Sequence, residues 1–127
     1  MPRKTIRTSD APSSPYFSQA VKAGSTVYLS GIVGADPKTN RIVGSSIEEQ
    51  TRQSLENCRS ILHAADSDLD DVVEVQVLLA RPEDFAGFNA AYTEFFASDA
   101  PARSVCKLGV EISGVLVSIR MTAYVGA

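Results

Sequence analysis

Residues 46–65 have the pattern of a capped amphipathic helix, which needs an apolar surface to pack against. Ser46 is a favoured N-cap residue, and Glu49 follows three residues later, as in a capping box. Small and apolar side chains then recur at helical spacing, with charged side chains on the opposite side. We therefore expect a helix over Ile47–Ala65 with one face against a sheet. Its predicted buried face holds Ile47, Thr51, Leu55, Cys58, Leu62 and Ala65.

Short segments rich in β-branched and aromatic residues, bounded by Gly, Pro, Ser and Asn, predict the strands of that sheet. The run Val72–Ala80 is nearly all apolar, which indicates a strand buried on both faces. Before it, Asp66–Asp71 is predicted to be an acidic loop. The other predicted strands are Phe17–Ala23, Thr26–Val33, Arg41–Val43, Ser104–Val110 and Val115–Val125, with Thr5–Arg7 as a candidate edge strand.

A second helix is predicted to begin at Pro82, because proline suits the first helical position and acidic residues follow it. An aromatic stripe with a period of 3.6 residues runs along this helix. We interpret the stripe as core rather than as a platform for stacking bases, because the helical period explains every member. The stripe consists of Phe85, Phe88, Tyr92, Phe95 and Phe96.

These elements predict an α+β fold with a mixed six-stranded sheet and two helices on one face. Their order is strand-strand-strand-helix-strand-helix-strand-strand. The length of 127 residues is that of one domain, which we expect to span residues 1–127. A domain this small buries limited surface, so we expect self-association to cover the other face of the sheet.

Composition and residue counts disfavour several classes of protein, among them nucleic-acid-binding, membrane-spanning and zinc proteins. The net charge of −3 disfavours a nucleic-acid partner, since proteins that hold a phosphate backbone are usually basic. No apolar run approaches the roughly 20 residues of a membrane-spanning helix. Cys58 and Cys106 form no CxxC motif, so we expect free thiols, both in the core, and a cytoplasmic protein. His63 is the single histidine, which leaves too few ligands for a typical zinc site.

Several segments, taken together, resemble one family. They run in order and nearly without gaps from Ala11 to about Val125: Ser18–Gly24, Leu29–Gly31, Asp36–Thr39, Glu49–Asn57, Asp84–Phe85 with Asn89 and Tyr92, and Pro101–Ser104. On these residues the chain is similar to the reactive-intermediate deaminases, the RidA/YjgF family, once described as translation inhibitors or L-PSP endoribonucleases. The resemblance implies a chorismate-mutase-like α+β fold and a homotrimer with a ligand pocket at each subunit interface. It also implies hydrolysis of enamine or imine intermediates, such as 2-iminopropanoate, to a 2-keto acid and ammonia without a cofactor.

The resemblance assigns substrate-binding roles to four matching residues. It implies that Arg103 clamps a substrate carboxylate, and a planar guanidinium that stays charged is suited to this. The alternative for Arg103 is a salt bridge at a subunit interface. Ser30 and Gly31 match pocket-lining positions, although a glycine there also suits close strand packing. Asn89 matches as well, and we expect its amide to bond backbone more readily than ligand.

The last strand departs from the family pattern at two positions. An ungapped count from Arg103 places the family glutamate, which positions or activates the attacking water, at Ser118, and a second glutamate at Arg120. A serine without a partner base is a poor proton acceptor near neutral pH. Residues 118 and 120 share one strand face, so Arg120 would make the pocket more attractive to anions if that face lines it. Alternatively, Arg120 reaches solvent or pairs across the trimer.

Two loops also depart from the pattern of the family. The pocket tyrosine of the family falls on Phe17, unless a one-residue shift brings in Tyr16. Val110–Ile112 stands where the family has a Leu-Pro pair, and we expect Glu111 within it to be a solvated charge.

Three function classes follow from these residues. A hydrolase of imines or enamines that carry a carboxylate follows from the whole-chain resemblance and Arg103. A binding module that holds a small carboxylate without turnover follows from the replacements at Ser118 and Arg120. A ribonuclease is disfavoured, because the basic residues are scattered and the aromatic residues are predicted to be buried. We expect the hydrolase, with no metal, no cofactor, and no nucleic-acid or membrane partner.

Overall fold

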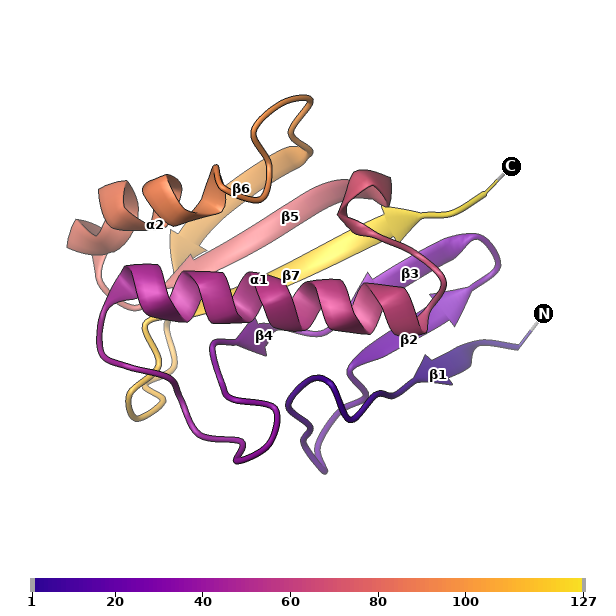
Figure 1. Cartoon of the computed structure of the whole chain (residues 1–127), viewed down its shortest axis with the longest axis horizontal. Helices are drawn as coiled ribbons and strands as arrows, with labels where there is room; N and C mark the ends of the chain where they lie inside the picture. Colours follow the sequence, from indigo (N-terminus) through magenta and orange to yellow (C-terminus); the bar gives the residue numbers. More distant parts are fainter. Residues whose placement is uncertain (1, 127) are drawn as a thin grey trace.

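The computed structural model describes residues 2–126, which form a mixed sheet with two helices packed on one face (Figure 1). Only β5 and β6 run parallel, and every other pair of neighbouring strands is antiparallel. The α+β prediction is confirmed, with seven strands in place of the predicted six. In spatial order the strands are β1 (Lys4–Ile6), β2 (Ala20–Ala23), β3 (Thr26–Leu29), β7 (Val117–Tyr124), β5 (Val72–Leu79) and β6 (Ala102–Lys107), with β4 (Ile32–Val33) pairing β7.

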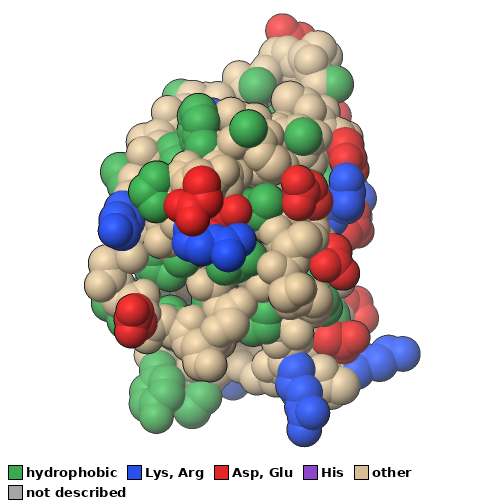
Figure 2. All heavy atoms as spheres, turned by 90° about the vertical axis from the view of Figure 1, so that its left-hand side faces the viewer, with side chains coloured by type: hydrophobic (Ala, Val, Ile, Leu, Met, Phe, Trp, Pro, Cys, Tyr) green, Lys and Arg blue, Asp and Glu red, His purple; other side chains and the backbone are tan. Residues whose placement is uncertain are grey.

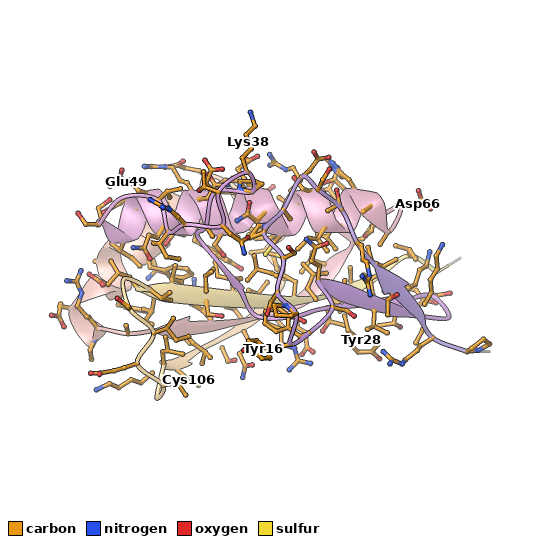
Figure 3. The ribbon with its side chains drawn as sticks, turned by 90° about the horizontal axis from the view of Figure 1, so that it is seen from below. Tyr16, Tyr28, Lys38, Glu49, Asp66 and Cys106 are labelled. Atoms are coloured by element: carbon orange, nitrogen blue, oxygen red, sulfur yellow. The ribbon has the colours of Figure 1, made fainter. Side chains whose placement is uncertain are left out.

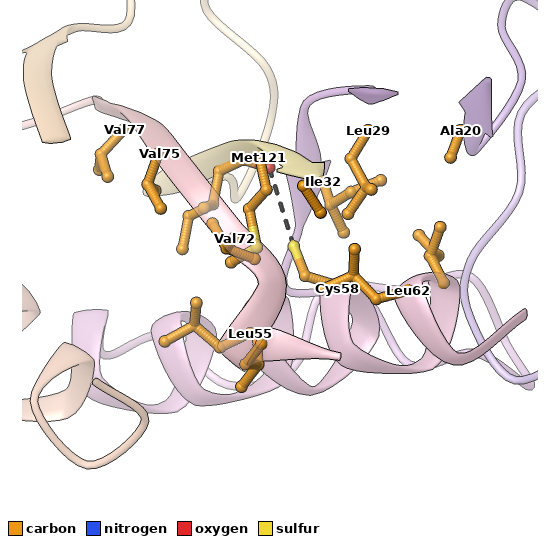
Figure 4. Close-up of a cluster of buried hydrophobic side chains, with 14 of the residues drawn as sticks. Ala20, Leu29, Ile32, Leu55, Cys58, Leu62, Val72, Val75, Val77 and Met121 are labelled. Atoms are coloured by element: carbon orange, nitrogen blue, oxygen red, sulfur yellow. Dashed lines mark hydrogen bonds between the residues drawn. The ribbon is translucent and has the colours of Figure 1, made fainter. Parts of the chain in front are cut away.

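Helix α1 (Ile47–Ala64) forms as its sequence pattern predicts. The Ser46 hydroxyl accepts a hydrogen bond from the backbone N–H of Glu49 at 3.2 Å and donates one to the Glu49 carboxylate at 2.9 Å. All six residues of the predicted buried face are buried. Cys58 lies among them with its thiol 3.9 Å from the carbonyl oxygen of Ile119 (Figure 4). Burial raises the pKa of this thiol to about 12, so Cys58 behaves as an apolar core residue.

Helix α2 (Phe85–Tyr92) begins three residues later than predicted, because Pro82–Asp84 forms a 3₁₀ turn. Phe88, Tyr92 and Phe96 are buried, and their rings follow one another at centroid distances of 5.3 and 4.9 Å. The predicted core role is wrong for Phe85, whose side chain is 47% exposed at the first turn. The aromatic stripe is therefore core along most of its length and surface at one end.

The predicted strand Thr26–Val33 is broken at Ser30 and Gly31. Tyr28 of β3 pairs with Thr122, and Ile32 of β4 pairs with Ile119, so the register on β7 shifts by one residue across the break. At the break neither residue pairs with β7, although the backbone N–H of Ser30 still donates to the carbonyl oxygen of Gln19 at 3.0 Å. Ser30 and Gly31 therefore line hollows beside β7 instead of continuing the pairing with it.

Two further local predictions need correction. Arg41–Val43 does not form a strand, because Ile42 makes only an isolated bridge with Ala35. The acidic segment Asp66–Asp71 is not entirely loop, since Leu69–Asp71 forms a short 3₁₀ helix capped by Asp68. Leu69 is buried there, which gives the turn an apolar anchor.

Within residues 2–126, no helix packs on the sheet face turned away from α1. Tyr28 and Cys106 lie on that side (Figure 3). Cys106 is exposed, so its predicted core position is wrong, although it does face away from Arg103. Val73 is 50% exposed, so β5 is not buried on both faces as predicted. Both errors have the same cause: an apolar strand is covered only where another element packs on it.

Gln50 ties α1 to the segment before β7. Its amide nitrogen donates to the carbonyl oxygen of Gly114 at 2.9 Å, and its amide oxygen accepts from the backbone N–H of Leu116 at 2.9 Å. The side chain is buried, so both backbone groups depend on it. We expect Gln50→Ala to lower the free energy of unfolding by about 2–4 kcal/mol, because it leaves two polar groups without partners. Urea unfolding measures this.

The matched control for Gln50 is Gln53→Ala on the same helix. The Gln53 amide donates to Asn57 but is only half-buried, so we expect a loss below about 1 kcal/mol. Equal losses for the two variants would contradict the role given to Gln50.

Candidate functional site

Arg103 on β6 lies against one side of α2 and forms the first of two clusters. One terminal nitrogen of its guanidinium, Nη1, donates to Oδ1 of Asn89 at 2.8 Å. The guanidinium carbon lies 4.9 Å from the ring centroid of Tyr92, 5.5 Å from that of Phe88 and 6.0 Å from that of Phe85. We call these five residues the arginine cluster. Rings at i, i+3 and i+7 share one side of the helix, so α2 presents a cation–π platform to the arginine.

The arginine cluster leaves the charge of Arg103 uncompensated by any carboxylate within residues 2–126. Asn89 occupies only one of its five N–H donors, and the side chain is exposed. The predicted backbone bond of Asn89 is wrong, because its oxygen accepts from Arg103 instead. An oriented guanidinium with spare donors is suited to bind a carboxylate in bidentate fashion.

Tyr92 forms the buried floor beneath Arg103. Burial raises the pKa of its hydroxyl, while the nearby charge of Arg103 acts in the opposite direction. The hydroxyl therefore stays protonated at neutral pH. Its oxygen makes no hydrogen bond within residues 2–126, so Tyr92 contributes here through its ring.

The second cluster surrounds a cavity of about 390 Å³, which we call the Ser118 cavity. Phe17, Gly31 and Ser118 line it together, so the fold brings three predicted site residues to one place. A Cβ atom added to Gly31 would lie 2.8 Å from the Ser118 hydroxyl oxygen. The absence of a side chain at Gly31 is therefore what allows the Ser118 hydroxyl to lie against this backbone.

A neighbouring groove of about 450 Å³ holds the remaining predicted residues. Ser30 and Arg120 line it, and Phe17 and Gly31 line both the groove and the Ser118 cavity. The Ser30 hydroxyl donates to the carbonyl oxygen of Ser18 at 2.6 Å, so it braces the entrance loop. Arg120 is exposed in the groove and does not line the Ser118 cavity.

Of the two entrance-loop aromatics, Phe17 lines both hollows and Tyr16 lines neither. The side chain of Tyr16 is 91% exposed. The ungapped alignment, which put Phe17 in the pocket position, thus agrees with where the two side chains lie.

The two clusters lie on opposite faces of the sheet. Arg103 shares its strand face with Val105, which packs against the core under the helices. Ser118 alternates with the buried residues Val117 and Ile119, so it faces the side without helices. Within one chain, Arg103 and Ser118 therefore project from opposite faces of the sheet, although Arg103 and Arg120 both line one hollow of about 310 Å³.

Sequence reasoning missed the apolar walls of the Ser118 cavity. Ile42, Ile112 and Val115 come from two loops and contribute to its lining. The sequence pattern placed Ile42 and Val115 in predicted strands and Ile112 in a loop, so it gave no sign that the three share a cavity. The helical period identifies Phe85, Phe88 and Tyr92 as core residues, and it does not predict that their rings contact Arg103.

The end of the molecule that includes α2 carries positive and negative side chains side by side, with apolar groups between them (Figure 2). Within residues 2–126, no group of three or more His, Cys, Asp or Glu side chains is placed to hold a metal ion. The helices of this described part are too short or too polar to cross a membrane.

Comparison with known proteins gives a consistent result. The family model described as "Endoribonuclease L-PSP" matches residues 8–125. A RutC family protein from Pyrococcus horikoshii is 42% identical over 124 residues, which is 96% of this chain and 98% of that protein. The 2-iminobutanoate/2-iminopropanoate deaminase of Mus musculus is 39% identical over 98% of this chain and 93% of its own length. The crystal structure of RidA from an Antarctic Psychrobacter superimposes with a TM-score of 0.90 at 36% identity, covering 95% of this chain and 98% of that one.

Proposed function

The chain belongs to the RidA/YjgF family, and from this premise we propose that it is a cofactor-independent hydrolase of imines or enamines that carry a carboxylate. The products would be a 2-keto acid and ammonia. The observation that carries the proposal is the arginine cluster: an exposed guanidinium, oriented by Asn89 and an aromatic platform, with no carboxylate partner in the described chain. Relatives named as deaminases of 2-iminobutanoate and 2-iminopropanoate support it.

In the proposed reaction, water adds to the carbon of the C=N bond, and the resulting tetrahedral intermediate expels ammonia. Arg103 holds the carboxylate and fixes the orientation of this carbon. Phe17 and Gly31 line the space around it, and the Ser118 hydroxyl hydrogen-bonds the attacking water. None of the described residues that line the Ser118 cavity has a titratable side chain that could act as a base for Ser118. The Ser118 hydroxyl therefore positions the attacking water more than it removes a proton from it.

The proposed site needs more than one copy of the chain. Arg103 and Ser118 lie on opposite sheet faces, and the face without helices exposes Tyr28 and Cys106. A homotrimer with a pocket at each subunit interface would bring the arginine cluster of one copy to the Ser118 cavity of the next. We expect light scattering to give a mass three times that of one chain. A monomer at the concentrations used for activity would contradict this arrangement.

A binding module remains the second candidate, because the Ser118 cavity contains no carboxylate to act as base. It would hold a small carboxylate at Arg103 without turnover. The α2 end of the molecule gives no support to a ribonuclease, since its charges are mixed rather than basic (Figure 2).

The deciding experiment is an imine hydrolysis assay. An amino-acid oxidase generates 2-imino acids in the reaction, and semicarbazide traps the imine that survives. We expect the protein to lower semicarbazone formation in proportion to its concentration. Binding of a 2-keto acid without any such effect would favour the binding module.

The proposal also places the protein in the cytoplasm, and the free thiols of Cys58 and Cys106 agree with a reducing compartment.

A further inference from the structure

The Ser118 cavity combines three site residues with a lining that is largely apolar. Besides Phe17, Gly31 and Ser118, its walls include Ile42, Ile112 and Val115. None of the described residues that line it is charged. Arg120, which shares the strand face of Ser118, lines the neighbouring groove and not this cavity. A substrate group inside this cavity therefore meets hydrocarbon, hydroxyl groups and the side chain of Asn40, but no charge.

Ser118 is what keeps the cavity both open and uncharged. A glutamate at this position would extend a carboxylate into the space, whereas the serine side chain ends at a hydroxyl beside Gly31. The volume of about 390 Å³ lies in the range of small-molecule sites. Filling apolar volume with an apolar group is favourable in proportion to the area it removes from water, and burying a charge there is costly.

We propose that this protein prefers 2-imino acids with a branched or aromatic apolar side chain, and that the Ser118 cavity receives that side chain. The inference rests on the proposed function for the carboxylate at Arg103, and it adds the substrate class. The carboxylate lies toward the arginine cluster of a neighbouring copy, and the side chain points away from it into the cavity. Dicarboxylic imino acids are excluded, because their second carboxylate would lose its hydration without gaining a partner.

The test compares three imines, those derived from alanine, leucine and aspartate, each generated by a matching oxidase. We expect kcat/KM for the leucine-derived imine to exceed that for the alanine-derived imine at least 10-fold, the discrimination typical of added hydrocarbon in an apolar pocket. The aspartate-derived imine should be the poorest substrate. Equal values, or a preference for the aspartate-derived imine, would overturn the inference while leaving the hydrolase proposal intact.

Ile112→Asp tests the cavity wall directly. Ile112 is 49% exposed, so a charge there should not prevent folding, which circular dichroism would verify. We expect the leucine-over-alanine preference to fall at least 10-fold. The matched control is Val110→Asp in the same loop, since Val110 is 66% exposed and does not line the cavity. An equal loss of preference in both variants would contradict the role of the cavity.

A binding measurement keeps the inference testable if no imine is hydrolysed. Calorimetry with 4-methyl-2-oxopentanoate, pyruvate and 2-oxoglutarate uses stable keto acids in place of the imines. We expect 4-methyl-2-oxopentanoate to bind at least 10-fold more tightly than pyruvate, and Ile112→Asp to remove the difference. This result without turnover would reject the hydrolase and retain the substrate class. Tighter binding of 2-oxoglutarate would reject the substrate class itself.

Discussion

Arg103→Ala is expected to lower kcat/KM for every 2-imino acid substrate by roughly 10²–10³-fold. Truncating one partner of a buried hydrogen-bonded charge pair costs about 2–5 kcal/mol, and the proposed pocket between copies would bury this pair. Each 1.36 kcal/mol corresponds to about tenfold in rate. The fold should survive, because the Arg103 side chain is exposed and, within residues 2–126, its one side-chain hydrogen bond goes to Asn89. The measurement is the imine hydrolysis assay, together with the melting temperature of each variant.

Two further variants make the Arg103 result specific. Arg103→Lys keeps the charge but loses the planar fork, so we expect only partial recovery of kcat/KM. Arg3→Ala removes an exposed arginine next to β1, at the opposite edge of the sheet from β6, and should leave activity unchanged. Full activity in Arg103→Ala would refute carboxylate binding at this residue.

Ser118→Glu is expected to raise kcat for the alanine-derived imine by about 10²-fold or more. A positioned general base typically contributes about 10²–10⁴-fold, and the cavity has no carboxylate of its own. The same change should lower kcat/KM for the leucine-derived imine, because the new side chain fills the apolar space and brings a charge into it. The two imines should therefore change in opposite directions.

Ser118→Gln separates the two effects of that substitution. Glutamine has nearly the volume of glutamate but cannot accept a proton, so it should reduce turnover of the bulky imine without accelerating the small one. Equal rates for the Glu and Gln variants on the alanine-derived imine would show that a base at position 118 does not limit the reaction. Ser118 would then lie in a site whose water is activated by another group.

The sequence predicts helices more closely than strands in this chain, for a physical reason. The period of α1 is local, and each turn repeats the same apolar side, so its range and its buried face follow from the sequence alone. The break of β3 and β4 at Ser30 and Gly31 depends instead on how β7 pairs with each part. Pairing across about 90 residues leaves no local signal in either segment.

The sequence names a set of candidate residues, but how the fold groups them was not predictable. Strand alternation does place Arg103 and Cys106 on opposite faces, and Ser118 and Arg120 on the same face. It does not show which face the helices cover, so Cys106 was assigned to the core and is exposed. It also does not show that Arg120 lies in a groove separate from the Ser118 cavity.

By itself, the sequence determined the α+β class, the position and buried face of α1, and the residues that match the family. These properties depend on local periodicity and on the identity of side chains at fixed spacings. The tertiary structure alone decided that Gly31 and Ser118 meet, that loop residues such as Ile112 line the same cavity, and that Arg103 lies on the other face. Such neighbours are set by the packing of segments distant in the chain, and no pattern within a single segment encodes them.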